Sequence, residues 1–254
     1  MTTLFDLELY PAEIIKRPSA KCKTPYVADA KINYQEAPIL AHTPALGCCG
    51  LSDKGASVLV SKMPLPPSGS KKKPSVCSHR VELGQQNNTL IGLNPKLAER
   101  IVECCFQKQI IPNRRFVREK TILNSRFDFV GMDDSKIPFI CEVKTAPLLQ
   151  PDSTISYFPD GYRKKKGAPV SPRALKHLGD LIEVAQTSKT RAMMCYVVQR
   201  GDSTEFVPSD TDPIYKAKFY EAKEAGVEMW ALQVSYVKKE ENIVSCDFKK
   251  LYRL

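Results

Sequence analysis

The sequence lacks three features that would each have fixed its cellular setting. Among its 254 residues no run approaches the roughly 20 apolar residues needed to cross a bilayer. The first residues, Met1 to Asp6, lack the basic start and apolar stretch of a secretory signal. The nine cysteines form no C-x-x-C pair and no cluster with histidine at zinc spacing. We therefore expect a soluble protein without a membrane partner, in a reducing, intracellular and by default cytoplasmic setting, whose thiols are structural or incidental.

The charge balance is one-sided. Lysine and arginine number 38 against 28 aspartate and glutamate, which gives a formal net charge of +10. With 43% hydrophobic and 26% charged residues, the chain has enough apolar material to bury a core. A basic excess of this size suits a partner with regularly spaced negative charge, nucleic acid first. The alternative is a basic surface without such a partner.

A change of composition marks residues 64–75, which are rich in proline, serine and lysine. This composition predicts a loop or an insertion. The run from Lys71 to Lys73 fits a solvated loop, and it also fits a nuclear-import or phosphate-contacting patch. A nuclear location therefore stays open beside the cytoplasmic one.

Before this loop the sequence predicts short strands. Residues 25–29, 38–42 and 56–60 are rich in β-branched and other apolar side chains, with glycine and proline between them. Several short strands at such spacing indicate a small barrel or sandwich. No segment in this part of the chain has a helical pattern.

After residue 92 the pattern becomes mixed. We expect helices that start at Asn94-Pro95, Ser171-Pro172 and Asp212-Pro213, the first ending near Gln109 and the third at Gly226, and strands over 116–123, 126–131, 138–145, 192–199 and 227–237. The expected order is α-β-β-β-α-β-α-β. It predicts a mixed α/β domain built on a sheet.

One arrangement within this order invites a chemical interpretation. Asp128 lies in one predicted strand, and Glu142 and Lys144 lie in the next. Because strand side chains alternate, Glu142 and Lys144 share a face, and the two adjacent strands can bring Asp128 beside Glu142. Two clustered carboxylates bind hard cations such as Mg²⁺, and a neighbouring ammonium can orient the attacking water. This combination suits phosphodiester hydrolysis.

The same residues have a simpler interpretation. Acid-x-lysine triplets are common, and others in this chain begin at Asp29, Asp134, Glu221 and Asp247. Only Glu142 and Lys144 lie in an otherwise apolar strand that directly follows another strand with an acid. Charges at such a position are costly unless they are paired or bound to metal. A Glu142–Lys144 salt bridge at the sheet edge is therefore the alternative to a metal site.

Several sequence blocks in the same order resemble those of a known family. They are Ser125-Arg126-Phe127-Asp128-Phe129, Cys141-Glu142-Val143-Lys144, Phe158-Pro159-Asp160, and a helix start with Arg173, Lys176, His177 and Leu178. Together they resemble the sugar fermentation stimulation protein (SfsA) family. This resemblance implies an all-β OB-like barrel over residues 1–88, including the loop at 64–75. It also implies an α/β restriction-endonuclease-like domain of the PD-(D/E)xK type over residues 89–254, with a mixed central sheet.

The resemblance also implies roles for individual residues. Asp128, Glu142 and Lys144 are expected to be catalytic, and Asp128 and Glu142, with Glu103 on the preceding helix, are expected to bind Mg²⁺ or Mn²⁺. The nucleic-acid contacts that we expect are Arg17, Arg126, Arg173, Lys176 and His177, together with Arg163 and Lys164 of residues 161–170, a segment that is an insertion relative to the family. Arg173, Lys176 and His177 begin a helix, whose free N–H groups favour phosphate.

Two further interpretations compete with a nuclease. The first is a DNA-binding regulator of sugar metabolism that keeps the fold but does not cut. The second is a scaffold or chaperone-like protein whose charge is incidental. Intact Asp128, Glu142 and Lys144 favour the enzyme. DNA is expected over RNA as the partner, and the oligomeric state stays open, with a dimer among the alternatives.

Overall fold

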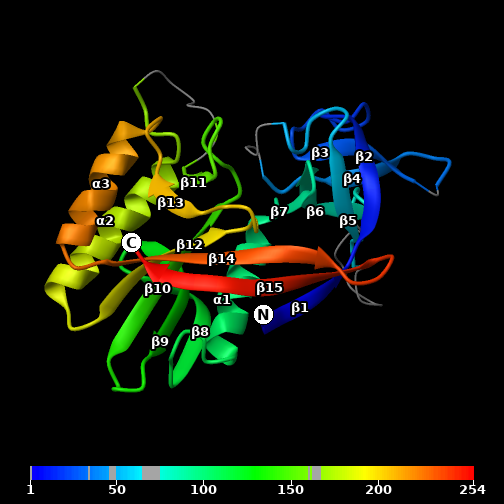
Figure 1. The fold of residues 1–254 in the computed structure, drawn as a ribbon. Coiled ribbons are helices and arrows are strands. Elements are labelled where there is room, and N and C mark those ends of the chain that lie inside the picture. Colours follow the sequence, from blue (N-terminus) through cyan, green and yellow to red (C-terminus); the bar gives the residue numbers. More distant parts are fainter. Residues whose placement is uncertain (1, 34, 46–49, 65–74, 160, 162–166) are drawn as a thin grey trace. The chain divides into compact units, whose positions relative to one another are not determined.

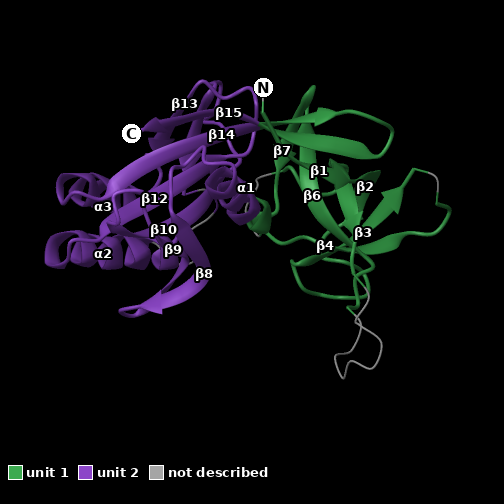
Figure 2. Ribbon diagram, turned by 90° about the horizontal axis from the view of Figure 1, so that it is seen from below, with its two compact units in different colours: residues 1–97, 235–247 green, residues 98–234, 248–254 purple. Residues whose placement is uncertain are grey.

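The computed structural model describes residues 2–33, 35–45, 50–64, 75–159, 161 and 167–254. The chain forms two compact units (Figure 2), residues 1–97 with 235–247 and residues 98–234 with 248–254. In the described ranges no helix is long and apolar enough to cross a membrane. The expectations for the lysine run, Arg163 and Lys164 lie outside the described residues.

The first unit contains a closed β-barrel. Its strands are β2 (Tyr10–Lys16), β3 (Val27–Ile32), β4 (Ile39–His42), β5 (Ser57–Lys62), β6 (His79–Gln86) and β7 (Thr89–Gly92). They follow the order β4-β3-β2-β5-β6-β7, and an additional parallel pairing of β4 with β6 closes five of them. The side chains alternate as a half-buried strand requires, since Ala12 and Ile14 are buried while Glu13 between them is exposed. The expected OB-like barrel is confirmed.

The second unit is built on a mixed sheet (Figure 1). Its elements are α1 (Pro95–Gln107), β8 (Arg115–Ile122), β9 (Ser125–Met132), β10 (Pro138–Ala146), β11 (Ile155–Phe158), α2 (Pro172–Thr187), β12 (Arg191–Val198), β13 (Glu205–Pro208), α3 (Pro213–Glu224), β14 (Glu228–Lys238) and β15 (Ile243–Arg253). The first residues of α1, up to residue 97, and residues 235–247, which include the end of β14 and the start of β15, belong to the first unit. With β1 (Thr2–Glu8), the sheet has the order β1-β15-β14-β12-β10-β9-β8. Strands β10, β12 and β14 are parallel to one another, whereas β9 is antiparallel to both of its neighbours, β8 and β10. The expected mixed α/β class is confirmed.

The expected element order was incomplete. The structure adds β11 and β13, which pair in parallel as a separate ladder, and β15 at the end of the chain. Strands β11 and β13 are four residues long, too short for an alternating pattern to be recognised. Strand β15 has a mixed, partly charged sequence, so its pattern differs from an apolar run. The first helix ends at Gln107 rather than near Gln109.

The sheet of the second unit is packed on two faces. On one face, α2 and α3 pack against each other and α2 packs against β12 (Figure 1). The core on this side includes Ile140, Leu178, Leu181, Met194, Tyr196 and Phe219. On the other face, Phe106 of α1 lies with its ring centroid 5.3 Å from that of Phe139 and 5.4 Å from that of Phe129.

Candidate active site

Asp128 lies where the ladder between β9 and β10 ends. The pairing runs from Pro138 opposite Met132 to Cys141 opposite Phe129, and it stops before Asp128. At this point the main-chain N–H of Val143 donates a hydrogen bond to Oδ2 of Asp128 over 2.8 Å. The carboxylate thus takes the place of a backbone carbonyl. This bond fixes Asp128 against β10, the strand that carries Glu142 and Lys144.

Glu142 is buried among cationic and hydrogen-bonding partners. Its residue is only 2% exposed, and its Oε1 atom accepts from both Lys144 Nζ and His177 Nδ1. Because an ionised carboxylate only accepts hydrogen bonds, Nδ1 of His177 carries a proton. The other oxygen, Oε2, is buried and has no hydrogen-bond partner among the described residues. A buried carboxylate oxygen without a partner is costly, so this atom marks a place where a ligand would stabilise the site.

The two carboxylates have opposite pKa shifts. Burial raises the pKa of Glu142, but Lys144 and His177 outweigh it and leave the pKa of Glu142 below its ordinary value. Burial, followed by the negative charge of Glu142, raises the pKa of Asp128 to about 6, although the hydrogen bond from Val143 opposes the shift. Near neutral pH the site therefore holds a stable negative charge beside a second carboxyl that ionises reluctantly. A bound cation would favour the ionised form of both.

Two acids on α1 face β8. Arg118 of β8 binds Glu99 over 2.8 Å and Glu103 over 2.6 Å, which their spacing of four residues on one helix face allows. Glu103 was the helix acid expected at the metal site. Glu99 is the one whose negative charge contributes to the raised pKa of Asp128. Glu99 was not identified from the sequence, and its i, i+4 relation to Glu103 was the available signal.

Two of the expected nucleic-acid contacts have buried side chains that form hydrogen bonds within the protein. In the first unit, Arg17 donates to the carbonyl oxygens of Pro25 over 2.8 Å and Ala45 over 2.7 Å, and its side chain is 7% exposed. These bonds hold neighbouring segments of that unit together. In the second unit, His177 is 3% exposed and faces Glu142. This placement suits a residue that positions Glu142 better than one that touches a phosphate.

The other described candidates lie at the surface. Arg126 is paired with Glu119 and its side chain is 60% exposed. Arg173 is exposed near the start of α2. Lys176 donates to the carbonyl oxygen of Asn124 over 2.8 Å, and its side chain is half exposed. The second unit therefore carries three cations that are accessible to a large ligand, Arg126, Arg173 and Lys176.

The donor set at Asp128 and Glu142 fits a hard cation with a large share of water ligands. Carboxylate oxygens are the ligands that Mg²⁺ and Mn²⁺ prefer, and Mg²⁺ usually keeps several waters. Within the described part of the chain, no group of three His, Cys, Asp or Glu side chains is arranged to hold a metal. The candidate metal ligands are therefore the carboxylates of Asp128 and Glu142. The Oε2 atom of Glu142 has no hydrogen-bond partner among the described residues.

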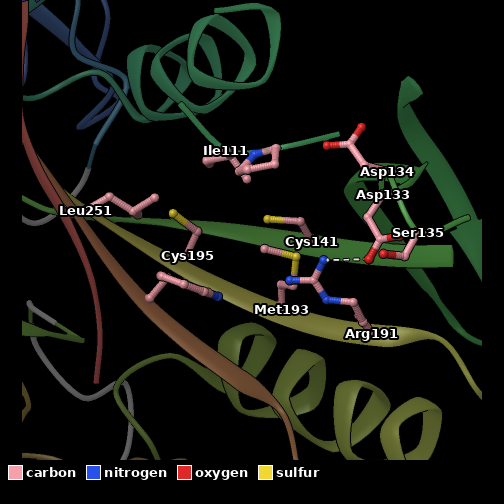
Figure 3. A pocket seen from close by; sticks show the side chains of 11 residues that line it. Ile111, Asp133, Asp134, Ser135, Cys141, Arg191, Met193, Cys195 and Leu251 are labelled. Atoms are coloured by element: carbon pink, nitrogen blue, oxygen red, sulfur yellow. Dashed lines mark hydrogen bonds and ion pairs between the residues drawn. The ribbon is translucent and has the colours of Figure 1, made fainter. Parts of the chain in front are cut away.

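The second unit also contains a cavity of about 300 Å³ that is separate from these residues. Figure 3 shows Cys141 and Cys195 directed into it and Arg191 held by Asp133, whose Oδ2 lies 3.0 Å from the guanidinium. Asp128, Glu142 and Lys144 do not line this cavity. Burial raises the pKa of both thiols, so neither is an activated nucleophile. These two thiols therefore add no nucleophile to the site.

Comparisons with known proteins give a consistent result. Residues 96–240 match the family model described as "Sugar fermentation stimulation protein RE domain". A "Sugar fermentation stimulation protein homolog" of Bartonella tribocorum is 30% identical over 234 residues, which are 89% of this chain and 88% of that protein. A homolog of the same description from a Synechococcus species is 32% identical over 204 residues, or 78% and 77% of the two chains. The solved structure of Pyrococcus furiosus SfsA in complex with Ca²⁺ has the same fold, with a TM-score of 0.77 at 19% identity over 98% of both chains.

Proposed function

The chain belongs to the sugar fermentation stimulation protein (SfsA) family, and from this premise we propose that it binds DNA and hydrolyses phosphodiester bonds with the help of Mg²⁺ or Mn²⁺. The observation that carries the proposal is the buried Oε2 atom of Glu142, which has no described partner and lies on the strand beside Asp128. That the Pyrococcus furiosus SfsA was solved with Ca²⁺, another hard cation, supports a divalent metal.

In this proposal Asp128 and Glu142 hold the cation through their oxygens. A cation held by these two residues would make water more acidic and would offset negative charge on the scissile phosphate. His177 holds Oε1 of Glu142, so that Oε2 stays directed to the ligand. Lys144, 15% exposed at its side chain, places its ammonium at the carboxylate, where it orients the attacking water and stabilises developing negative charge.

Nucleic acid is the substrate class that the charge favours. A net charge of +10 draws a polyanion to the protein surface and accelerates encounter at low salt. Arg126 lies two residues before Asp128, Arg173 and Lys176 lie four residues and one residue before His177, and all three cations are exposed. Electrostatic attraction of this kind supplies most of the affinity for DNA without reading its sequence. We accordingly propose DNA as the partner, with Arg126, Arg173 and Lys176 at its phosphates.

The test is cleavage of labelled single- and double-stranded DNA in Mg²⁺ or Mn²⁺, with binding measured separately in Ca²⁺. Wild type should cut, and Asp128→Asn, Glu142→Gln and Lys144→Met should bind but not cut. The matched control is Asp134→Asn, which neutralises an exposed acid in the turn after β9 and should cut like wild type. Equal loss of cutting in the control would overturn the assignment of the site.

A DNA-binding regulator that does not cut is the second candidate function. The hydrogen bonds of Glu142 favour this candidate, because Lys144 and His177 already donate to its carboxylate. In that case wild type binds DNA with a steep salt dependence and cuts neither strand form in any metal. Glu142 and Lys144 would then be a structural pair.

A further inference from the structure

Strand β8 and its turn form an unusually exposed edge of the second unit. Strand β8 is the last strand of its sheet, next to β9 (Figure 1). From residue 114 to residue 124 every residue is exposed except Phe116 and Ile122, which are half-buried, and Val117 is 55% exposed. None of the described strands pairs with the outer edge of β8, which therefore presents main-chain groups. An edge of this length needs either a protective device or a partner.

The hairpin of residues 114–126 is rich in positive charge. It contains Arg114, Arg115, Arg118, Lys120 and Arg126 against one acid, Glu119, a net charge of +4 from five cations and one anion. Arg118 pairs with acids of α1, and Arg126 pairs with Glu119. Arg114, Arg115 and Lys120 are exposed, and none of the three has a hydrogen bond or ion pair from its side chain to a described residue.

The hairpin is also held in place beside the candidate active site. Lys176 of α2 donates to the carbonyl oxygen of Asn124 at the hairpin tip over 2.8 Å, and Ser125 Oγ is bonded to Asp180 of α2. Asp128 lies two residues after Arg126 on the same strand, a separation of about 7 Å at the usual rise of a strand. A ligand lying along this hairpin would therefore reach Asp128.

We propose that the hairpin of residues 114–126 contacts the phosphate backbone and holds a DNA strand against the candidate active site. The inference rests on the proposed function and adds the surface that it uses. Arg115 begins β8 and Lys120 lies near its end, so a polyanion along this edge strand would meet positive charge at both places.

The charge of the edge argues against a second copy of this chain as its occupant. Pairing two β8 strands would bring arginine and lysine side chains of one copy beside those of the other. Like charges directly opposite each other destabilise a pair of strands. A polyanion removes this repulsion, and each phosphate contact releases a counterion from the DNA.

The experiment compares two double variants of the full chain that lose the same charge. Arg115→Ala/Lys120→Ala removes two free cations of the hairpin, and Lys189→Ala/Lys223→Ala removes two exposed cations of the same unit at a distance in sequence. The affinity for a labelled 20-base-pair duplex is measured by fluorescence anisotropy from 50 to 300 mM KCl. Ca²⁺ replaces Mg²⁺, so that the DNA stays intact.

Each lost phosphate contact should lower the magnitude of the slope of log affinity against log salt by about 0.9, so the loss of two contacts should lower it by about 2. At 0.1 M salt the hairpin variant should therefore bind about 60-fold more weakly than wild type. The control variant should keep the wild-type slope. If wild type binds and cuts while the hairpin variant keeps the wild-type slope, the inference is wrong and the proposed function stands. If wild type binds no DNA at 50 mM KCl, both are wrong. A change of mass in light scattering between wild type and the hairpin variant, with unchanged DNA affinity, would instead assign the cations to control of self-association.

Discussion

Replacing Asp128 with asparagine should stabilise the metal-free protein at neutral pH while it removes cleavage. Burial and the Glu142 carboxylate raise the pKa of Asp128 from 3.8 to about 6 in the folded chain. The folded state thus binds this proton more tightly than the unfolded state, so the free energy of unfolding falls as pH rises from about 4 to about 6. Each tenfold change in an acid constant is worth about 1.4 kcal/mol, so the ionised carboxylate costs about 3 kcal/mol above pH 6. Asparagine avoids this cost and can still accept the hydrogen bond from Val143.

The assay is urea unfolding in EDTA at two pH values. The variant should gain about 3 kcal/mol over wild type at pH 7.5 and about half of that at pH 5, where the folded wild type is largely protonated at Asp128. Asp134→Asn is the control and should change little at either pH. A divalent cation at 100 times its dissociation constant should stabilise wild type by about 2.7 kcal/mol and the variant much less. A variant that is less stable at pH 7.5, or a gain that does not shrink at pH 5, would refute this reasoning.

Two further substitutions test the packing around the site. His177→Ala removes a hydrogen bond to the buried Glu142 carboxylate. Because hydrogen bonds to charged groups are worth about 2–3 kcal/mol, the free energy of unfolding measured by urea denaturation should fall by about this amount. A change below about 0.5 kcal/mol would contradict this role. Gly131→Ala would place a methyl group 2.4 Å from the carbonyl oxygen of Arg115 and 2.4 Å from the Phe139 ring, so we expect a loss of about 3 kcal/mol. A thermal midpoint equal to that of wild type would show that the strands adjust freely.

The sequence alone predicted the fold class and part of the barrel, for reasons that particular strands make clear. Strands β3, β4 and β5 have apolar runs between turn residues, and these were recognised. Strand β2 contains Pro11, which argues against a strand because proline donates no ladder hydrogen bond. The structure places Pro11 next to the start of the strand, and its neighbours Ala12 and Ile14 carry the pairing with β3.

The candidate site was predictable to the extent that it depends on neighbouring strands. Asp128 lies against the strand that carries Glu142, as expected, because one turn joins the two strands and Val143 donates a hydrogen bond to the Asp128 carboxylate. His177 as the partner of Glu142 was not predictable, because 35 residues separate them and the contact depends on how α2 packs on the sheet. Glu99 was missed for a similar reason, since helix spacing alone does not distinguish it from Glu103.

The return of residues 235–247 to the first unit has a consequence for synthesis of the chain. At about 5–20 residues per second, the 150 residues that separate position 97 from position 247 take roughly 8–30 seconds to emerge. During this interval the first unit lacks one of its two segments, and nearly all of the second unit, up to residue 234, is synthesised. Each unit therefore reaches its full set of contacts only near the end of translation. For the same reason, no single cut in the gene separates the two units into independent polypeptides.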